Sequence, residues 1–183
     1  MASLFLQNLE EHNALLVTLG SLNDDVLRAG QMAASTLQQG GKILFCGNGG
    51  SAADSQHLAA ELTGRFIKDR RPLAGMALST DSSALTCIGN DYSFDEVFAR
   101  QVAGLGRAGD LLIGISTSGN SRNVIRAVEE AHQLGMQTVG LLGRDGGQLR
   151  GMCTHSIVVP HAVTARIQEC HILIGHTLCG LIE

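Results

Sequence analysis

The sequence predicts an α/β protein with a parallel sheet that carries helices on both faces. Short apolar runs alternate with segments of helical periodicity along most of the chain, and this alternation is typical of parallel sheets. A length of 183 residues with 16% charged residues fits one ordered globular domain. We therefore expect a single domain over residues 1–183, in which a helical pair (1–39) precedes an α/β core (40–183).

The individual elements follow from the positions of the apolar residues. Residues 2–20 and 24–39 carry apolar side chains at helical spacing, with a break that starts at Ser21. Five apolar runs predict the strands: Lys42–Cys46, Gly75–Ser79, Leu111–Ile115, Thr138–Leu142 and Ser156–Val159. Helices are expected near 51–64, 82–88, 93–105, 120–134 and 163–182. Either Asp81 or Ser82 is the expected N-cap of the helix at 82–88.

The composition excludes several classes of protein. The net charge is −4 and no basic cluster exceeds Arg70–Arg71, so binding driven by nucleic-acid phosphates is not expected. Aromatic residues make up 3% of the chain, which argues against base stacking on single strands. No apolar run reaches membrane-spanning length, and the first residues lack the basic region of a signal peptide.

The cysteines indicate a reducing compartment. The five are odd in number and show no CxxC spacing, which fits neither a disulfide framework nor a structural zinc site. Cys46 and Cys179 lie within apolar patterns, so we expect buried thiols and a cytoplasmic protein.

Two glycine- and serine-rich loops follow apolar strands directly. The first runs from Gly47 to Ser51 and the second from Ser116 to Ser121, and a helix is predicted after each. Helix N-termini present free N–H groups and a positive dipole end, which suits a phosphate group. The alternative is that both loops are tight turns that need glycine for a positive φ. The hydroxyls of Ser116, Thr117, Ser118 and Ser121 favour phosphate, because they can also donate hydrogen bonds.

Further polar residues lie on the helices of the predicted core. His57 and Glu61 are four residues apart and share a helical face, so they can act as acid and base or bind a divalent metal together. The alternative is a surface polar pair. Gln168 and His176 lie two turns apart on the last helix, and the stretch from His171 to His176 is otherwise apolar. A histidine there can equally be a core residue bonded to a backbone carbonyl. We expect His132, His155 and His161 to be surface or loop residues.

Four segments together resemble the sugar isomerase (SIS) domain family over nearly the whole chain. They are Cys46–Asp54, Ile88–Asp91, Gly114–Ser121 and Arg166–His171. The resemblance implies a flavodoxin-like three-layer sandwich, with a five-stranded parallel sheet and extra N-terminal helices. It is greatest to members that interconvert D-sedoheptulose 7-phosphate and D-glycero-D-manno-heptose 7-phosphate, at the start of the path to ADP-heptose of lipopolysaccharide or capsule. Such proteins are homotetramers with active sites at subunit interfaces.

The resemblance also implies roles for individual residues. Glu61 and His176 correspond to the proton-transfer residues. The substrate-binding residues would be Asn48, Gly49, Gly50, Ser51, Glu61, Asn90, Asp91, Ser116, Thr117, Ser118, Ser121 and Gln168. In members that contain zinc, the metal ligands match His57, Glu61, Gln168 and His176.

Two other functions remain open from the sequence. One is a non-catalytic SIS adaptor that binds the bacterial replication initiator, and the other is an isomerase of a different phosphosugar. The adaptor lacks counterparts of Glu61 and His176, so the presence of both residues favours an enzyme. Asn90 and Asp91 are equally compatible with ordinary turn chemistry.

Overall fold

The sheet has five parallel strands, as the sequence predicts. The computed structural model describes residues 3–183, so Ala2 of the first predicted helix lies outside the described residues. The strands are β1 (Ile43–Gly47), β2 (Gly75–Ala77), β3 (Leu111–Ser116), β4 (Gln137–Gly143) and β5 (His155–Val159). Their order across the sheet is β2-β1-β3-β4-β5, which is the flavodoxin-like arrangement.

Helices account for most of the remaining chain. They are α1 (Leu4–Thr18), α2 (Asn23–Gln38), α3 (Gly50–Thr63), α4 (Ser82–Asp91), α5 (Ala99–Leu105), α6 (Arg122–Gln133), α7 (Leu149–Met152) and α8 (Thr164–Ile182). Short 3₁₀ turns occupy Leu19–Leu22 and Phe94–Glu96. The predicted break after the first helix is thus confirmed. Asp81 caps α4 by accepting a hydrogen bond from the N–H of Ala84, which also confirms the predicted cap.

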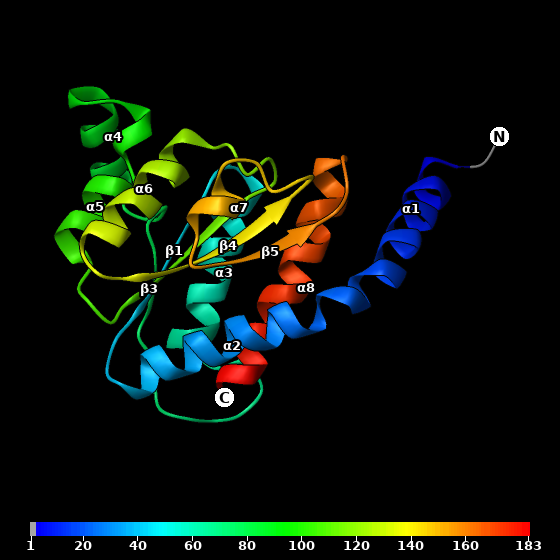
Figure 1. Cartoon of the computed structure of the whole chain (residues 1–183), viewed down its shortest axis with the longest axis horizontal. Coiled ribbons are helices and arrows are strands. Elements are labelled where there is room, and N and C mark those ends of the chain that lie inside the picture. The colour runs from blue at the N-terminus through cyan, green and yellow to red at the C-terminus, as the bar shows by residue number, and fades with distance from the viewer. Residues whose placement is uncertain (1–2) are drawn as a thin grey trace.

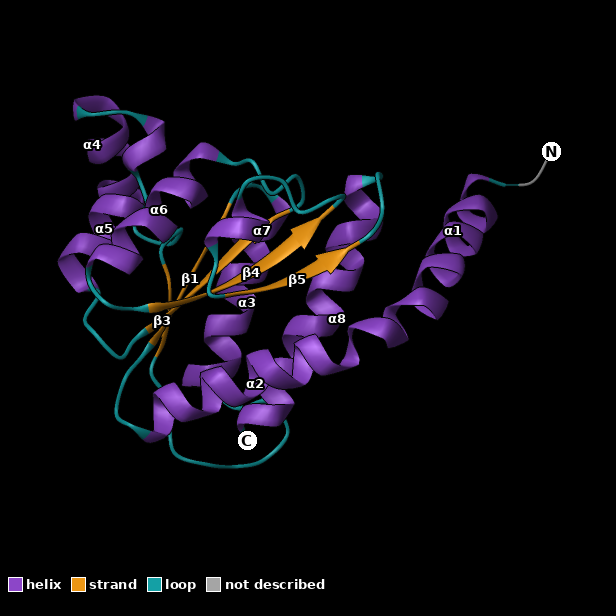
Figure 2. Ribbon diagram, viewed as in Figure 1, coloured by secondary structure: helices purple, strands orange, loops and turns teal. Residues whose placement is uncertain are grey.

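The helices form two layers, one on each face of the sheet (Figures 1 and 2). Alternate strand residues point to opposite faces, so Phe45 and Ile113 pack with α2, α3 and α8, whereas Leu44 and Leu112 pack with α5 and α6. Helix α1 extends away from this body and reaches it mainly at α8 (Figure 1). The three-layer sandwich is therefore confirmed. Among residues 3–183, every helix is too short or too polar to cross a lipid bilayer.

Several local predictions are wrong. The segment 93–105 is not one helix, because a 3₁₀ turn precedes α5 and is held by Arg126, whose Nε donates to Glu96 Oε1 at 2.8 Å. Helix α4 continues through Asn90 and Asp91, which the sequence left after the helix. Helix α7 was not predicted.

His155 was expected at the surface, but it lies buried at the start of β5. Its Nε2 donates to the backbone oxygen of Asp25 on α2 at 2.8 Å, and this bond satisfies the ring in its buried position. Cys46 and Cys179 are buried and free, as expected.

Candidate active site

The two loops singled out in the sequence lie side by side at the carboxyl edge of the sheet. One connects β1 to α3 and the other connects β3 to α6. Strands β1 and β3 are neighbours although β2 lies between them in the chain, so the strand order reverses at this point. Ligands of open α/β sheets bind in the crevice at such a reversal. The fold therefore brings both loops to its expected ligand site.

The first loop is tied to the second through two asparagines. Asn48 and Asn123 exchange two amide hydrogen bonds of 2.8 Å, which join the β1–α3 loop to the first turn of α6. Gly49 has a φ of +57°, so the tight-turn interpretation is correct for its backbone. Ser51 is buried in the first turn of α3. Asn48 therefore has a structural bond in addition to any contact with a ligand.

The second loop, which we call the hydroxyl loop (Ser116–Ser121), is closed by its own side chains. The hydroxyls of Ser116 and Ser121 are 2.9 Å apart, and the N–H of Asn120 donates to Ser118 Oγ at 3.1 Å. Because Oγ of Ser118 accepts that bond, its hydrogen remains able to donate. Gly119 has a φ of +65°, again a conformation that favours glycine. The loop thus combines a glycine turn with several hydroxyls at the N-terminus of α6.

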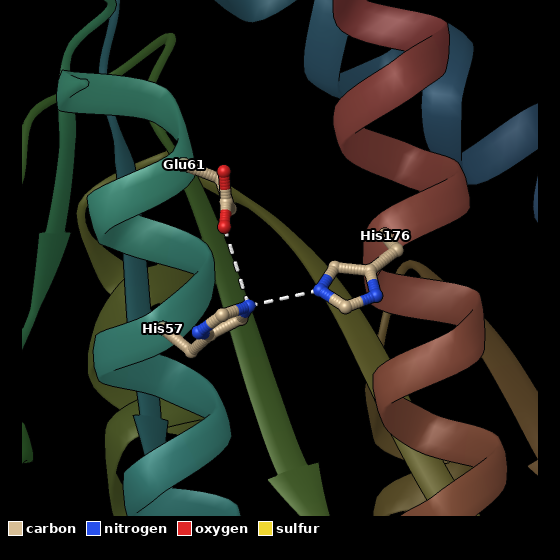
Figure 3. Close-up of side chains that lie close together, drawn as sticks. All are labelled: His57, Glu61 and His176. Atoms are coloured by element: carbon tan, nitrogen blue, oxygen red, sulfur yellow. Dashed lines mark hydrogen bonds and ion pairs between the residues drawn. The ribbon is translucent and has the colours of Figure 1, made fainter. Parts of the chain in front are cut away.

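Three side chains from α3 and α8 meet and form what we call the histidine cluster (His57, Glu61 and His176; Figure 3). Nε2 of His57 is 2.9 Å from Nε2 of His176 and 3.3 Å from Oε1 of Glu61. One of the two Nε2 atoms must carry a hydrogen and donate to the other. One ligand atom from each residue lies within 4.8 Å of the other two. Two imidazoles and a carboxylate can transfer protons or bind a divalent metal ion.

Two further residues border the histidine cluster. The ring of Phe66 stacks on that of His176, with 5.5 Å between centroids and 24° between planes. Asp54 precedes His57 by one turn of α3, and its buried Oδ2 has no hydrogen-bond partner among residues 3–183. Burial raises the pKa of Asp54 above its ordinary value, while the nearby His57 and His176 act in the opposite direction. The cluster is therefore covered on one side by an aromatic ring and approached on another by a carboxylate.

Gln168 lies apart from the histidine cluster within this chain. A Cβ at Gly50 would come within 2.3 Å of Gln168 Nε2, so this side chain rests against the first turn of α3. The eight residues from Gln168 to His176 correspond to about 12 Å along the helix axis. Of the four residues matched to zinc ligands, the chain thus brings three together.

Asn90 and Asp91 form another separate group. They lie exposed at the end of α4, on the opposite face of the sheet from α3 and α8 (Figure 1). Asn90 Nδ2 donates to Asp91 Oδ1 at 2.8 Å, and the Cys87 thiol donates to Asp91 Oδ2 at 3.4 Å. Within one chain these two residues do not reach the histidine cluster.

Three residues around the site were not among the site residues predicted from the sequence. Asn123 is a buried polar residue in an apolar helix face, and only its bond to Asn48 reveals its role. Asp54 lies one turn before His57, so the helical period could have indicated it. Phe66 follows the end of α3 in an irregular segment, and no periodicity relates it to His176.

This fold and these side chains define an α/β domain with a candidate ligand site at the carboxyl edge of a parallel sheet. The sequence profile of the SIS domain matches residues 8–143. The phosphoheptose isomerase of Campylobacter jejuni subsp. jejuni serotype O:6 is 52% identical over 183 residues, which cover 100% of this chain and 98% of that protein. That of Nitratiruptor sp. is 65% identical over 142 residues, 78% of this chain and 76% of that protein.

Solved structures agree with the sequence relatives. The phosphoheptose isomerase of Neisseria gonorrhoeae superposes with a TM-score of 0.93 at 49% identity, covering 97% of this chain and 96% of that one. A phosphoheptose isomerase of Francisella tularensis gives a TM-score of 0.91 at 39% identity, covering 100% and 98%. The chain therefore belongs to the SIS domain family and, within it, to the phosphoheptose isomerases.

Proposed function

We propose that the chain is an aldose–ketose isomerase that converts D-sedoheptulose 7-phosphate to D-glycero-D-manno-heptose 7-phosphate, the first step towards ADP-heptose. The observation that carries this proposal is the histidine cluster, in which a carboxylate and two imidazoles meet at the α3–α8 contact. The name shared by relatives above 50% identity supports the same activity. The whole chain, residues 1–183, works as one domain in this proposal.

The hydroxyl loop holds the phosphate end of the substrate. Its backbone N–H groups at the start of α6 and the hydroxyl of Ser118 offer hydrogen bonds to phosphate oxygens. Asn48, Gly49, Gly50 and Ser51 line the sugar from the neighbouring loop, and Gln168 faces the same edge from α8. Binding energy from the phosphate then positions C1 and C2 for proton transfer.

Glu61 and His176 carry out the proton transfers. In the open-chain ketose, the Glu61 carboxylate removes a proton from C1, and the electron pair moves to form a cis-enediol. A proton returned to C2 leaves the carbonyl at C1, while a proton passes between O1 and O2. His176 serves as the acid on these oxygens. Its ring contacts His57, which in turn contacts the Glu61 base, so the acid and the base lie in one cluster. A positioned base and donor are needed because a C–H beside a carbonyl is a weak acid.

The histidine cluster also fits a zinc ion in its donor set. The two Nε2 atoms are 2.9 Å apart, and imidazole nitrogens and carboxylate oxygens are donors that zinc accepts. His57, Glu61 and His176 would hold the ion; Gln168, the fourth residue matched by resemblance, lies apart from them within one chain. When bound, zinc would supply Lewis acidity for the carbonyl oxygen. Metal analysis of protein purified without chelator should find about one zinc per chain, and His57→Ala should lose it.

The proposed assembly is a cytoplasmic homotetramer. Helix α1 exposes Leu4, Phe5 and Val17 in the isolated chain, and large apolar side chains on one helix support a subunit contact. The distance of Asn90 and Asp91 from the histidine cluster also supports a site completed by a second chain. Light scattering should give four times the chain mass of 19.2 kDa, and a monomer would contradict the assembly.

Incubation with D-sedoheptulose 7-phosphate in deuterated water tests the function directly. NMR should show the aldose product with deuterium at C2, because the proton returned to C2 exchanges with solvent at the base. No product from this substrate, or turnover of another phosphosugar only, would overturn the proposal. Deuterium at C2 would also support the enediol route.

A further inference from the structure

The segment that follows α3 runs close to the end of α8. It leaves the helix at Gly64 and reaches β2 at Gly75 without regular structure, and it passes beside the point marked C in Figure 1. Such a segment needs partners for its backbone N–H groups, because neither helix nor sheet supplies them. The side chain of Glu183 is that partner.

The Glu183 carboxylate receives three consecutive backbone N–H groups. Phe66 donates to Oε1 at 3.0 Å, and Ile67 and Lys68 donate to Oε2 at 3.1 and 2.9 Å. The side chain is 2% exposed, so these bonds replace water almost completely. The bond from Lys68, followed by those from Ile67 and Phe66, lowers the pKa of Glu183 below its ordinary value, although burial opposes this. Successive N–H groups around one anion form a nest.

Arg70 connects this nest to the helix that carries Glu61. Its Nη2 donates to the backbone oxygen of Glu61 at 2.8 Å, and its Nη1 donates to that of Leu62 at 3.0 Å. Its Nε lies 3.3 Å from Glu183 Oε1. The last carbonyls of a helix lack partners within the helix, and Arg70 supplies them here. Glu183 thus connects through Arg70 to the end of α3.

Phe66 connects the nest to His176. Its N–H is bound by Glu183, while its ring stacks on the imidazole of His176. The ring also lies near Gly180 on the same helix, where an added Cβ would come within 3.6 Å of it. The ring therefore rests against α8 over one turn and covers one face of His176.

We propose that Glu183 is a positioning residue, whose carboxylate fixes residues 66–68 and thereby holds the Phe66 ring against His176. The inference rests on the proposed function only in that His176 is the acid of the isomerase. Glu183 does not touch the reacting atoms. Through the Phe66 ring, it restricts the orientation of the His176 imidazole, which does touch them in the proposed reaction.

Glu183→Gln tests this role, because it keeps the size of the side chain but removes the charge and one acceptor. The ring current of Phe66 should set the position of the His176 ring-proton resonance in NMR, assigned by its loss in His176→Gln. We expect that resonance to move in Glu183→Gln towards its position in Phe66→Leu. We also expect kcat to fall about tenfold with little change in KM, since ring orientation matters in the transition state.

Asp69→Asn is the matched control. It removes a negative charge from the same segment, but Asp69 is exposed and has no hydrogen bond or ion pair among residues 3–183. The His176 resonance and kcat should both stay at wild-type values in this variant. If Asp69→Asn moves them as far as Glu183→Gln does, loss of charge alone is responsible and the proposal is wrong.

The double variant Phe66→Leu/Glu183→Gln separates positioning from general stability. If Glu183 acts through Phe66, its loss should not lower kcat further once Phe66 is gone. Additive losses, or an unmoved His176 resonance in a folded Glu183→Gln, would overturn the proposal. If Glu183→Gln does not fold, Arg70→Lys provides a second test, because the shorter side chain weakens the connection between Glu183 and α3. The same His176 resonance should shift in this variant, and an unmoved resonance would overturn the proposal. The NMR readout needs no substrate, so it remains valid even if the chain fails to turn over sedoheptulose 7-phosphate.

Discussion

The hydroxyl loop and the histidine cluster are built in opposite ways. In the hydroxyl loop, the bonds join residues close in the chain, such as Ser116 with Ser121 and Asn120 with Ser118. In the histidine cluster, His57 and His176 are 119 positions apart and meet only because α3 packs beside α8. The side-chain bonds within the loop are thus specified by a short stretch of sequence, although Gly119 and Asn120 also bond to the backbone of residues 148 and 149. The cluster depends on tertiary packing. Changes in the loop should affect binding and local stability, whereas changes in the cluster should affect turnover.

The largest effect should come from Glu61→Gln, which removes the proposed base without changing its size. We expect kcat to fall at least about 100-fold, the usual contribution of a general base, with no loss of the folded state. Turnover of sedoheptulose 7-phosphate followed by NMR measures it. Glu130→Gln near the C-terminal end of α6, across the sheet from the histidine cluster, is the control and should keep wild-type kcat. Near-normal turnover in Glu61→Gln would remove this residue from the base role.

The same comparison explains how much the sequence could predict. The alternation of apolar runs and helical segments gave the parallel sheet, and the glycines gave both turns, because these are local properties of the chain. Helical periodicity says which residues share a face, but not which faces meet, so the contact of Phe66 with His176 could not be predicted. The break before α5 was missed for the same reason, since the Glu96–Arg126 bond that holds it is tertiary.

Helix α8 carries His171 and His176, and the sequence alone could not say which of them is a core residue and which belongs to the site. The structure assigns one to each. His171 is the core histidine, bonded to a backbone carbonyl, as one interpretation had it. His176 instead faces His57. Burial decides between the two, and burial depends on the neighbouring elements rather than on the stretch itself.

The second prediction concerns the stability of the hydroxyl loop. Gly119 has a positive φ, and an added Cβ would lie 1.9 Å from the backbone oxygen of Gly146. We expect Gly119→Ala to lower the free energy of unfolding by about 3 kcal/mol, from the strained backbone and the clash together. Urea denaturation measures the change. Gly135→Ala is the control, because φ is also positive there but the nearest atom is 3.5 Å away. Equal losses in both variants would mean that the clash contributes nothing.

A smaller effect should follow from Ser118→Ala, which removes one proposed phosphate donor. We expect KM to rise about tenfold, the weight of one hydrogen bond to a charged group, with kcat nearly unchanged. Steady-state kinetics with sedoheptulose 7-phosphate separates the two constants. Ser21→Ala, between α1 and α2, should change neither. A fall in kcat at constant KM would instead place Ser118 in the chemical step and weaken the contrast between the two regions.

The smallest effect concerns His171, which joins α8 to the end of β4 through one hydrogen bond to Leu142. Its Nε2–H donates to the oxygen of Leu142 at 2.9 Å, so the buried Nδ1 is the acceptor, and it has no partner among residues 3–183. Burial lowers the pKa of His171 from 6.5 to about 4, while the bond to Leu142 acts in the opposite direction. The unfolded chain therefore takes up the proton first, and stability falls as the pH drops from about 6.5 towards 4. From pH 7 to 5.5, wild type should lose about 1 kcal/mol more than His171→Gln, which keeps a donor but cannot titrate. Urea denaturation at both pH values measures this difference, and parallel losses in the two proteins would show that His171 does not titrate in this range.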